Sequence, residues 1–329
     1  MNTELLTSII IPCYNAEKYI HKCLESCLNQ RLDYNTFEII AIDDGSEDNT
    51  LNILHEFAHN NPQLHMQILT QKNAGQSRAR NHGLEYAHGK YILYLDSDDF
   101  FVDNTISEIL YTAIDNQLDM LWFDHQHVDE NYNLLPLPQA DCKKHVPTDI
   151  MSGIDFIKKA FNHSGMVWQF IFRKDFLIKN NILFFDGIIM QDIVYTLQCL
   201  YKCKRVQYYP ICAYNYLIRS NSVTRDMLKK RKRSLDGMKV AALLNDTFAT
   251  SKDNDLRLWI NDFMNGIVQF NLRRLVKNND NTGYELCISE LKRYNLLPLP
   301  MSFICRQIFL TKILNFSPIL YKQVVKLLH

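Results

Sequence analysis

The sequence lacks three features that would place it in a common class of protein. Its 36 basic and 36 acidic residues leave no net charge, which argues against a nucleic-acid-binding protein because phosphate contacts need a surplus of Lys and Arg. It has no run of 18 apolar residues and no N-terminal basic segment followed by an apolar one, so we expect neither membrane spanning nor secretion. Its nine cysteines form no CxxC pair, and we expect free thiols in a reducing cytoplasm.

Two common phosphate-binding signatures are also absent. No Gly-x-Gly-x-x-Gly follows the first predicted strand, and no Gly-Lys-Ser/Thr loop occurs. The place after the first strand holds Pro12, Cys13, Tyr14 and Asn15 instead. Any nucleotide must therefore be bound by other groups.

The first part of the chain alternates between two kinds of apolar pattern. Short apolar runs predict strands, and apolar residues at 3.6-residue spacing predict helices. The strands are expected at residues 8–12, 37–42, 66–70 and 91–95, and the helices at residues 16–30, 50–59 and 76–87. Because the connections are short, this order predicts an α/β fold: a Rossmann-like, mostly parallel sheet flanked by helices. The segments 120–123 and 166–172 are expected to be further strands.

Acidic residues follow two of the predicted strands directly, at residues 43–44 and 96–99. Ligands of open α/β sheets bind at the carboxyl ends of strands. If the strand geometry continues, Asp96 and Asp98 point the same way, and two carboxylates on one side suit Mg²⁺ or Mn²⁺. The alternative is an acidic turn that caps the following helix through Asp99 or Asp103.

Four segments, in consistent order, resemble the family 2 glycosyltransferases with the GT-A fold, of the bacterial polysaccharide-assembly type. They read SIIIPCYNAEKYIHKCLESCLNQ, FEIIAIDDGSEDNT, NAGQSRARNHGLEYAHGKYILYLDSDD and VWQFIFRKDFL, and the resemblance covers about residues 7–222. It implies a nucleotide-sugar donor, usually UDP-linked, a divalent Mn²⁺ or Mg²⁺ on the Asp-x-Asp motif, and inversion at the anomeric carbon.

The resemblance also implies roles for individual residues on the donor side. Asp44 would contact the base, Pro12 and Tyr14 would line the nucleoside pocket, and Arg80 would lie near the base or phosphates. In the Asp-x-Asp motif, Asp96 would hold the ribose side next to Ser97, and Asp98 would bind the metal, with Asp96 as a further metal ligand.

Three residues of the second half are candidates with open alternatives. A helix is expected to begin near Gln191, and the resemblance implies that Asp192 in its first turn is the catalytic base; the alternative is a helix-capping Asp. The family carries Glu where this chain has Gln191. Trp168 is either a stacking platform for the acceptor sugar or a core residue. Arg219 either pairs with phosphate in a closed state or lies in a solvent-exposed loop.

The C-terminal part is expected to differ in kind from the rest. We predict a GT-A catalytic domain in residues 1–224, with a nucleotide-sugar-binding half (1–116) and an acceptor-side half (117–224), and a helical C-terminal extension in residues 225–329. Residues 291–329 contain six Lys and Arg and no Asp or Glu. These helices are expected either to contact the inner face of the cell membrane peripherally or to pack on the catalytic domain or a second subunit.

These features together predict an enzyme. It would be an inverting, metal-dependent, hexosyltransferase-like glycosyltransferase of the EC 2.4 class, which moves a sugar from a nucleotide-sugar to a hydroxyl of a glycan or lipid-linked glycan in cell-surface polysaccharide synthesis. The alternatives are a sugar nucleotidyltransferase, which ordinarily has a Gly-rich loop after the first strand, and a catalytically weak or inactive binding protein, suggested by Gln191.

Overall fold

The chain folds into two compact units, seen in a computed structural model that describes residues 4–137, 146–161, 165–219, 227–300 and 305–328. The first unit comprises residues 1–187 and 195–220, and the second comprises residues 188–194 and 221–329. The domain boundary expected between residues 224 and 225 lies outside the described residues.

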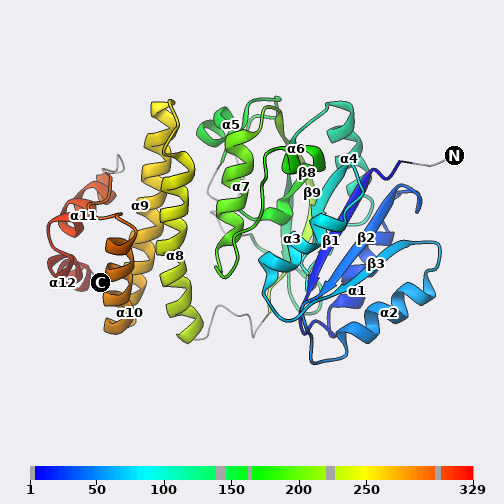
Figure 1. The fold of residues 1–329 in the computed structure, drawn as a ribbon, viewed down its shortest axis with the longest axis horizontal. Helices are drawn as coiled ribbons and strands as arrows, with labels where there is room; N and C mark the ends of the chain where they lie inside the picture. The colour runs from blue at the N-terminus through cyan, green and yellow to red at the C-terminus, as the bar shows by residue number, and fades with distance from the viewer. Residues whose placement is uncertain (1–3, 138–145, 162–164, 220–226, 301–304, 329) are drawn as a thin grey trace. The chain divides into compact units, whose positions relative to one another are not determined.

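The described residues of the first unit form one mixed sheet in the order β3-β2-β1-β4-β8-β6-β9-β5, with β7 paired to β6 (Figure 1). The strands are β1 Thr7–Cys13, β2 Phe37–Asp43, β3 His65–Thr70, β4 Tyr91–Tyr94, β5 Phe100–Phe101, β6 Met120–Val128, β7 Leu134–Leu135, β8 Phe170–Arg173 and β9 Val206–Leu217. The pairings among β3, β2, β1 and β4 are all parallel, as the alternation predicts. Beyond β4 the direction is mixed: β8 runs antiparallel to β4 and β6, and β9 runs parallel to β6.

Helices cover both faces of this sheet. They are α1 Ile20–Leu28, α2 Thr50–Asn60, α3 Gln76–Tyr86, α4 Ile106–Asp115, α5 Gly153–Lys159, α6 Lys174–Lys179 and α7 Gln191–Lys202, the last of which spans both units. One face packs against α1, α2 and α4 in a continuous apolar core, and α3 lies on the other face. A Cβ on Gly83 of α3 would come within 2.6 Å of Ile10 and 2.8 Å of Ile42. The glycine therefore allows α3 to approach β1 and β2 closely.

Two predicted elements are shorter than expected, and three strands, β5, β7 and β9, were not predicted. The helix predicted at 16–30 begins only at Ile20, and the strand predicted at 166–172 is a 3₁₀-turn, Val167–Gln169, followed by β8. Pairing with β4 and β6 therefore begins only at Phe170 and extends to Arg173, one residue beyond the predicted end. The twelve-residue β9 mixes polar and aromatic residues, and it is held by pairing with β6 rather than by a simple apolar run.

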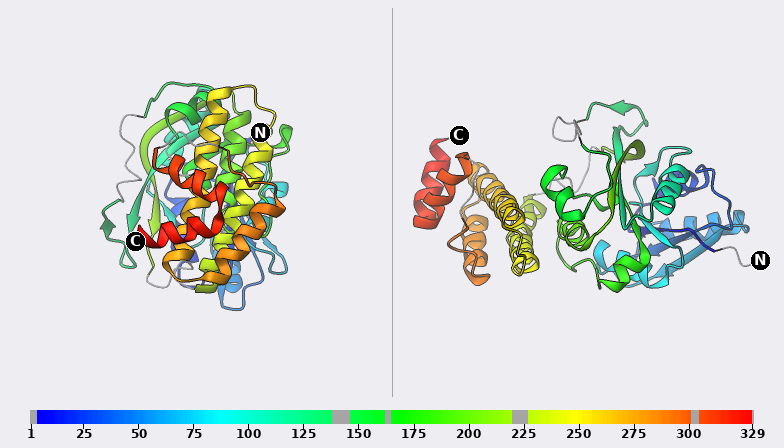
Figure 2. Two further views of the ribbon diagram at one scale, coloured as in Figure 1. Left: turned by 90° about the vertical axis from the view of Figure 1, so that its left-hand side faces the viewer. Right: turned by 90° about the horizontal axis from the view of Figure 1, so that it is seen from above.

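The second unit contains a helical C-terminal extension, as predicted. Its helices are α8 Met227–Phe248, α9 Asn254–Lys277, α10 Asn281–Arg293, α11 Cys305–Phe316 and α12 Pro318–Leu327. Helix α9 packs against α8, α10, α11 and α12, and Figure 2 shows α11 and α12 in red at the C-terminal end of the chain. The Arg231 side chain joins α8 to the start of α10 through two hydrogen bonds to Asp280, of 2.8 and 2.6 Å. Among the described helices, none combines the length and hydropathy that bilayer spanning requires.

A buried carboxylate at the amino end of β2 gives a first testable prediction, on stability. Glu38 accepts hydrogen bonds from the Ser8 hydroxyl (2.6 Å), the His88 N–H (2.6 Å) and the Gln67 amide (3.1 Å). Burial raises the pKa of Glu38, but the bonds from Ser8 and His88 outweigh burial and leave the pKa below its ordinary value of 4.5. The carboxylate therefore stabilises the fold above about pH 4.5, and this contribution is lost as the pH falls through the folded-state pKa.

We expect Glu38→Gln to lower the free energy of unfolding by about 1–3 kcal/mol near neutral pH, because donors lose a charged acceptor. The difference from the wild type should begin to shrink as the pH falls below about 4.5, and it should vanish only below the lower folded-state pKa, where the native wild-type carboxylate is also neutral. Urea unfolding near neutral pH and at a pH below the folded-state pKa measures this difference in the free energy of unfolding. Glu56→Gln, at an exposed position, is the control. A difference independent of pH would contradict the assigned protonation.

Candidate functional site

The Asp-x-Asp motif lies in a tight turn at the carboxyl end of β4. The strand ends at Tyr94, and the Asp99 N–H donates to the Asp96 carbonyl at 3.0 Å. The prediction that the Asp96 and Asp98 side chains point the same way required the strand to continue through the motif. The strand instead ends before Asp96. Burial, and after it the charge of Asp96 in the same turn, raises the pKa of Asp98.

Asp96 is held by two side chains from α3. The Arg80 guanidinium donates to Asp96 Oδ1 at 2.7 Å, and the Gln76 amide donates to the same oxygen at 2.9 Å. Arg80 is fully buried, and its guanidinium lies 5.1 Å from the ring centre of Phe184 and 5.9 Å from that of Tyr94. The structure thus makes Arg80 the partner of Asp96, where the resemblance implied only a position near the base or phosphates.

Asp98 is paired with Arg219. The Arg219 guanidinium contacts Asp98 Oδ2 and also lies over the Tyr19 ring, 5.3 Å from its centre. Burial and the Asp96 charge raise the pKa of Asp98, while the Arg219 charge opposes them. Arg219 is 30% exposed and Asp98 26% exposed, so the pair lies at the surface of the site. Arg219 thus lies in the loop after β9 as an ion-paired, partly exposed residue, and its pairing with phosphate stays a prediction.

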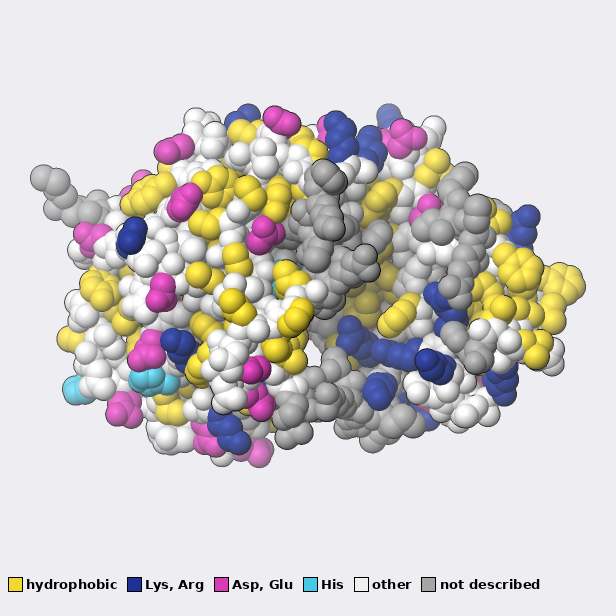
Figure 3. Space-filling model, turned by 180° about the vertical axis from the view of Figure 1, so that it is seen from behind, with side chains coloured by type: hydrophobic (Ala, Val, Ile, Leu, Met, Phe, Trp, Pro, Cys, Tyr) yellow, Lys and Arg dark blue, Asp and Glu magenta, His cyan; other side chains and the backbone are white. Residues whose placement is uncertain are grey.

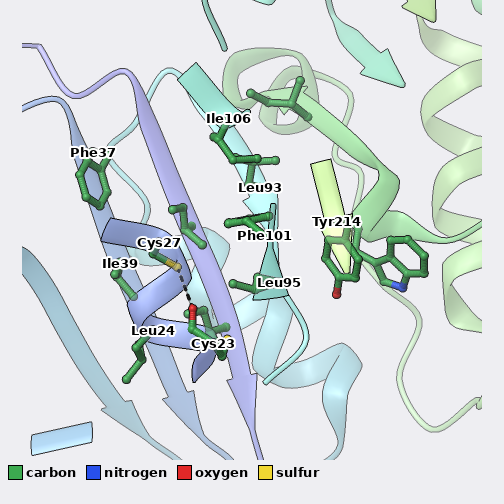
Figure 4. Close-up of a cluster of buried hydrophobic side chains, with 14 of the residues drawn as sticks. Cys23, Leu24, Cys27, Phe37, Ile39, Leu93, Leu95, Phe101, Ile106 and Tyr214 are labelled. Carbon is green, nitrogen blue, oxygen red and sulfur yellow. Dashed lines mark hydrogen bonds between the residues drawn. The ribbon is translucent and has the colours of Figure 1, made fainter. Parts of the chain in front are cut away.

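Asp99 does not cap the following helix. Its carboxylate is buried and accepts hydrogen bonds from the Tyr214 hydroxyl and the Leu217 N–H, both at 2.8 Å. Helix α4 has Thr105 at its N-cap position, without a side-chain capping bond. Figure 4 shows Tyr214 beside Phe101 and Leu95 in the core, with its hydroxyl at the edge of the cluster. Asp99 therefore connects the acidic turn to β9. Its partner Leu217 is the last residue of that strand and lies two residues before Arg219.

This tie gives a second prediction. Asp99→Ala should lower the free energy of unfolding by about 2–4 kcal/mol, because the Tyr214 hydroxyl and the Leu217 N–H lose their buried acceptor. Urea unfolding measures the loss. The exposed Asp103→Ala is the matched control, and we expect it to change stability by less than about 0.5 kcal/mol. A larger loss in Asp103→Ala would restore the helix-capping interpretation.

The residues expected around the nucleoside lie at the ends of β1 and β2. Pro12 is buried within β1, and Tyr14, just after it, is 49% exposed. Asp44 follows β2 and is buried; its Oδ1 accepts from the Gln71 amide and the Ala74 N–H, and its Oδ2 accepts from the Gly75 N–H, each at 2.8 Å. Asp44 thus positions the loop that leads into α3.

The same loop lines a cavity of about 410 Å³. Its lining residues are Gln71, Lys72, Asn73, Ala74 and Arg78. The sequence interpretation selected neither Lys72 nor Arg78 as a site residue. The available signal was their spacing on either side of the Asn-Ala-Gly turn before α3, which places two cations beside a strand end where ligands bind.

Trp168 is 3% exposed and lies in the core of the sheet. Its indole stacks on the Tyr214 ring at 4.2 Å between centres and on the Tyr216 ring at 5.5 Å, while His125 meets it edge-on at 5.0 Å. Protein side chains therefore cover the surface that an acceptor sugar would use. The packing alternative fits this geometry, and the stacking role expected for the acceptor does not.

Asp192 lies in the first turn of α7, as predicted, in the segment 188–194 of the second unit. The preceding turn is attached to α8, because the Ile189 N–H donates to Asp236 Oδ2 at 2.9 Å. Asp236 also accepts from Lys232 at 2.8 Å. Gln191, where the family has Glu, is buried.

The first unit thus brings several predicted residues to one edge of its sheet. Two carboxylates and two arginines meet at the acidic turn, where Ser97, between the two aspartates in the sequence, is half-buried: Arg80, Asp96, Asp98 and Arg219. The ends of β1 and β2, with Pro12, Tyr14 and Asp44, belong to the same carboxyl edge because β2, β1 and β4 are parallel neighbours.

A divalent metal is compatible with this donor set. Asp98 offers hard carboxylate oxygens near the surface, but no cluster of three or more His, Cys, Asp or Glu side chains suited to one ion occurs within the described ranges. Mg²⁺ and Mn²⁺ bound to one or two carboxylates commonly complete their shell with water and substrate phosphates. The residues therefore fit a metal that is shared with a diphosphate, rather than one enclosed by protein alone.

Comparison with known proteins gives a family match over half of the chain. Residues 8–178 match the model of glycosyl transferase family 2. The chain is 32% identical over 232 residues to the uncharacterized glycosyltransferase YibD of Escherichia coli, which covers 68% of this chain and 65% of YibD. It is 28% identical to the poly(ribitol-phosphate) beta-glucosyltransferase of Bacillus spizizenii over 64% of this chain and 32% of that protein. The matches therefore span less than two thirds of these relatives.

A solved structure shares the fold over nearly the whole chain. The S. aureus TarS 1-349 structure in complex with UDP-GlcNAc superposes with a TM-score of 0.74 and 19% identity, covering 98% of this chain and 91% of that one. At this identity the likeness shows the fold alone. It confirms the predicted GT-A fold and includes the helical C-terminal region.

Proposed function

Because this chain belongs to the family 2 glycosyltransferases, we propose that it is an inverting, metal-dependent enzyme that transfers a sugar from a nucleotide-sugar to a hydroxyl of a glycan or lipid-linked glycan in cell-surface polysaccharide synthesis. The observation that carries the proposal is the acidic turn after β4, where Asp96 and Asp98 each face an arginine at the carboxyl end of the strand. The UDP-GlcNAc bound to TarS, which has the same fold, supports a UDP-linked donor.

The nucleoside would bind at the ends of β1 and β2. Tyr14 exposes half of its side chain, which leaves its ring available for stacking on a base, and Pro12 would form the adjacent wall. The hydrogen bonds of Asp44 use two acceptor sites of Oδ1 and one of Oδ2. A carboxylate has about four such sites, so Oδ2 can accept one further bond from a base N–H.

The diphosphate would bind beside the acidic turn. Arg219 is the mobile partner in this proposal: it would leave Asp98 and pair with a phosphate, which a planar guanidinium binds through two parallel hydrogen bonds. Arg80 would stay on Asp96 and keep that carboxylate oriented toward the ribose side, with Ser97 between the two aspartates. A Mn²⁺ or Mg²⁺ bound to Asp98, with Asp96 as a further ligand, would supply Lewis-acid stabilisation of the leaving nucleoside diphosphate.

The proton of the acceptor hydroxyl would go to Asp192. A carboxylate in the first turn of a helix is stabilised as an anion by the helix dipole, which suits a base that must be ionised before the reaction. The acceptor oxygen would then form its bond to the anomeric carbon as the bond to the diphosphate breaks on the opposite face. An α-linked donor would yield a β-glycoside.

A donor screen tests the proposal. The purified chain is incubated with UDP-, GDP- and dTDP-sugars in Mn²⁺, Mg²⁺ or EDTA, and released nucleotide is measured with and without glycan acceptors. We expect release from one donor class that needs the metal and rises with a suitable acceptor, and NMR of the product should show inverted anomeric configuration. Metal-dependent donor binding without release from any donor, across a broad acceptor panel, would favour an inactive binding protein.

A further inference from the structure

The last two helices, α11 and α12, expose large apolar side chains to the solvent. On α12, the exposed Leu320 and Leu327 are seven residues apart and share one face, while Tyr321 and Val325 on another face are buried. On α11, Phe309 and Phe316 are exposed, while Leu310 and Leu314 are buried. We name the exposed large apolar side chains of these helices the C-terminal patch; it comprises Phe309, Phe316, Ile319, Leu320, Leu327 and Leu328.

The side chains of this patch are more exposed than large apolar side chains on a protein surface usually are. Phe316 is 84% exposed and Leu327 86% exposed, so each presents nearly its whole side chain to solvent. Figure 3 shows hydrophobic side chains gathered at the right-hand end of that view, where the C-terminal helices lie. Single exposed apolar residues are common on protein surfaces. A group of them on two adjacent helices instead indicates a surface that binds a membrane or another protein.

The charged side chains on α11 and α12 themselves are all basic. Lys312 and Lys326 are exposed on the same faces as the apolar residues, and residues 291–329 contain no Asp or Glu. Lys322 is used internally: it contacts Glu285 at 3.3 Å and lies 5.0 Å from the centre of the Tyr284 ring. The patch therefore combines apolar side chains with two available ammonium groups.

From this combination we propose that the C-terminal patch docks on the surface of an anionic lipid bilayer. The apolar side chains enter the boundary between headgroups and acyl chains, while Lys312 and Lys326 reach the lipid phosphates. A symmetric contact with a second copy would bring Lys312 and Lys326 against the same charges, which opposes that occupant. The inference is independent of turnover, since binding to a bilayer needs neither donor nor acceptor.

Vesicle sedimentation of the full chain tests the inference. Vesicles of phosphatidylcholine mixed with phosphatidylglycerol are compared with phosphatidylcholine alone, at low and high salt. We expect sedimentation with the anionic vesicles and release as salt screens the lysines. Lys312→Glu/Lys326→Glu should weaken binding at least about tenfold, because each lysine near an anionic surface contributes about fivefold. Phe316→Ser/Leu327→Ser should weaken binding to the anionic vesicles at low salt, although it leaves the charge unchanged, because it removes apolar contacts.

The control is Lys252→Glu/Arg257→Glu, which makes the same change in net charge at exposed positions near the amino end of α9, in the same unit but outside the patch. It should retain binding within about twofold, since charges beyond a Debye length of about 10 Å from the lipid are screened. Unchanged circular dichroism and melting temperature show that each variant is folded. No sedimentation of the wild type, or an equal loss in the control, would overturn the proposal. A dimer in light scattering that Phe316→Ser/Leu327→Ser dissociates, without vesicle binding, would assign the patch to a second copy.

Discussion

Asp192→Asn is expected to lower kcat by about 10²- to 10⁴-fold, the usual contribution of a general base. The amide keeps the shape of the side chain in the first turn of α7 but cannot take the proton of the acceptor hydroxyl. Donor affinity should stay close to that of the wild type, because the proposed donor groups come from β1, β2, α3 and the acidic turn. Transfer assays give kcat, and calorimetry with the nucleotide gives the affinity.

Two further variants separate a base from a helix-stabilising residue. Asp186→Asn removes an exposed carboxylate five residues before Gln191 and should leave kcat within about threefold of the wild type. Gln191→Glu restores the acidic pair of the family and should keep transfer activity, because Asp192 is retained. If Asp192 only stabilises α7, its replacement should cost about 0.3–1 kcal/mol of stability and leave kcat unchanged. That result would remove Asp192 from the mechanism.

Asp98→Asn should abolish the metal dependence of donor turnover and lower kcat/KM by about 10²-fold or more, because the site loses its surface carboxylate for a metal shared with the diphosphate. The variant also removes the ionic partner of Arg219, so that nucleotide binding without metal should be less impaired than turnover. Titration of Mn²⁺ against turnover, together with nucleotide binding in EDTA, measures both effects.

The control for Asp98→Asn is Asp103→Asn, which changes an exposed carboxylate five residues later in the sequence. It should behave like the wild type in both assays. Equal metal dependence in Asp98→Asn and the wild type would show that Asp98 is not a metal ligand. The Arg219 pair would then be a structural contact of the acidic turn.

Much of the fold follows from local spacing. The buried runs of β1, β2 and β4 and the 3.6-residue pattern of α2 and α3 were predicted within one or two residues of their ends. These patterns are local because a strand or helix that buries one or both faces must repeat its apolar residues at the period of its own backbone. The acidic residues at the ends of β2 and β4 were predictable for the same reason.

The sequence by itself therefore determined the α/β order, the helical C-terminal part and the position of the carboxylates at strand ends. The tertiary structure decided the partners: Arg80 on Asp96, Arg219 on Asp98, and the β9 groups on Asp99. It also decided that Trp168 is buried by the two tyrosines of β9. Periodicity specifies which face a residue occupies, but the neighbour across that face depends on which distant strand the sheet places there, and no local pattern encodes it.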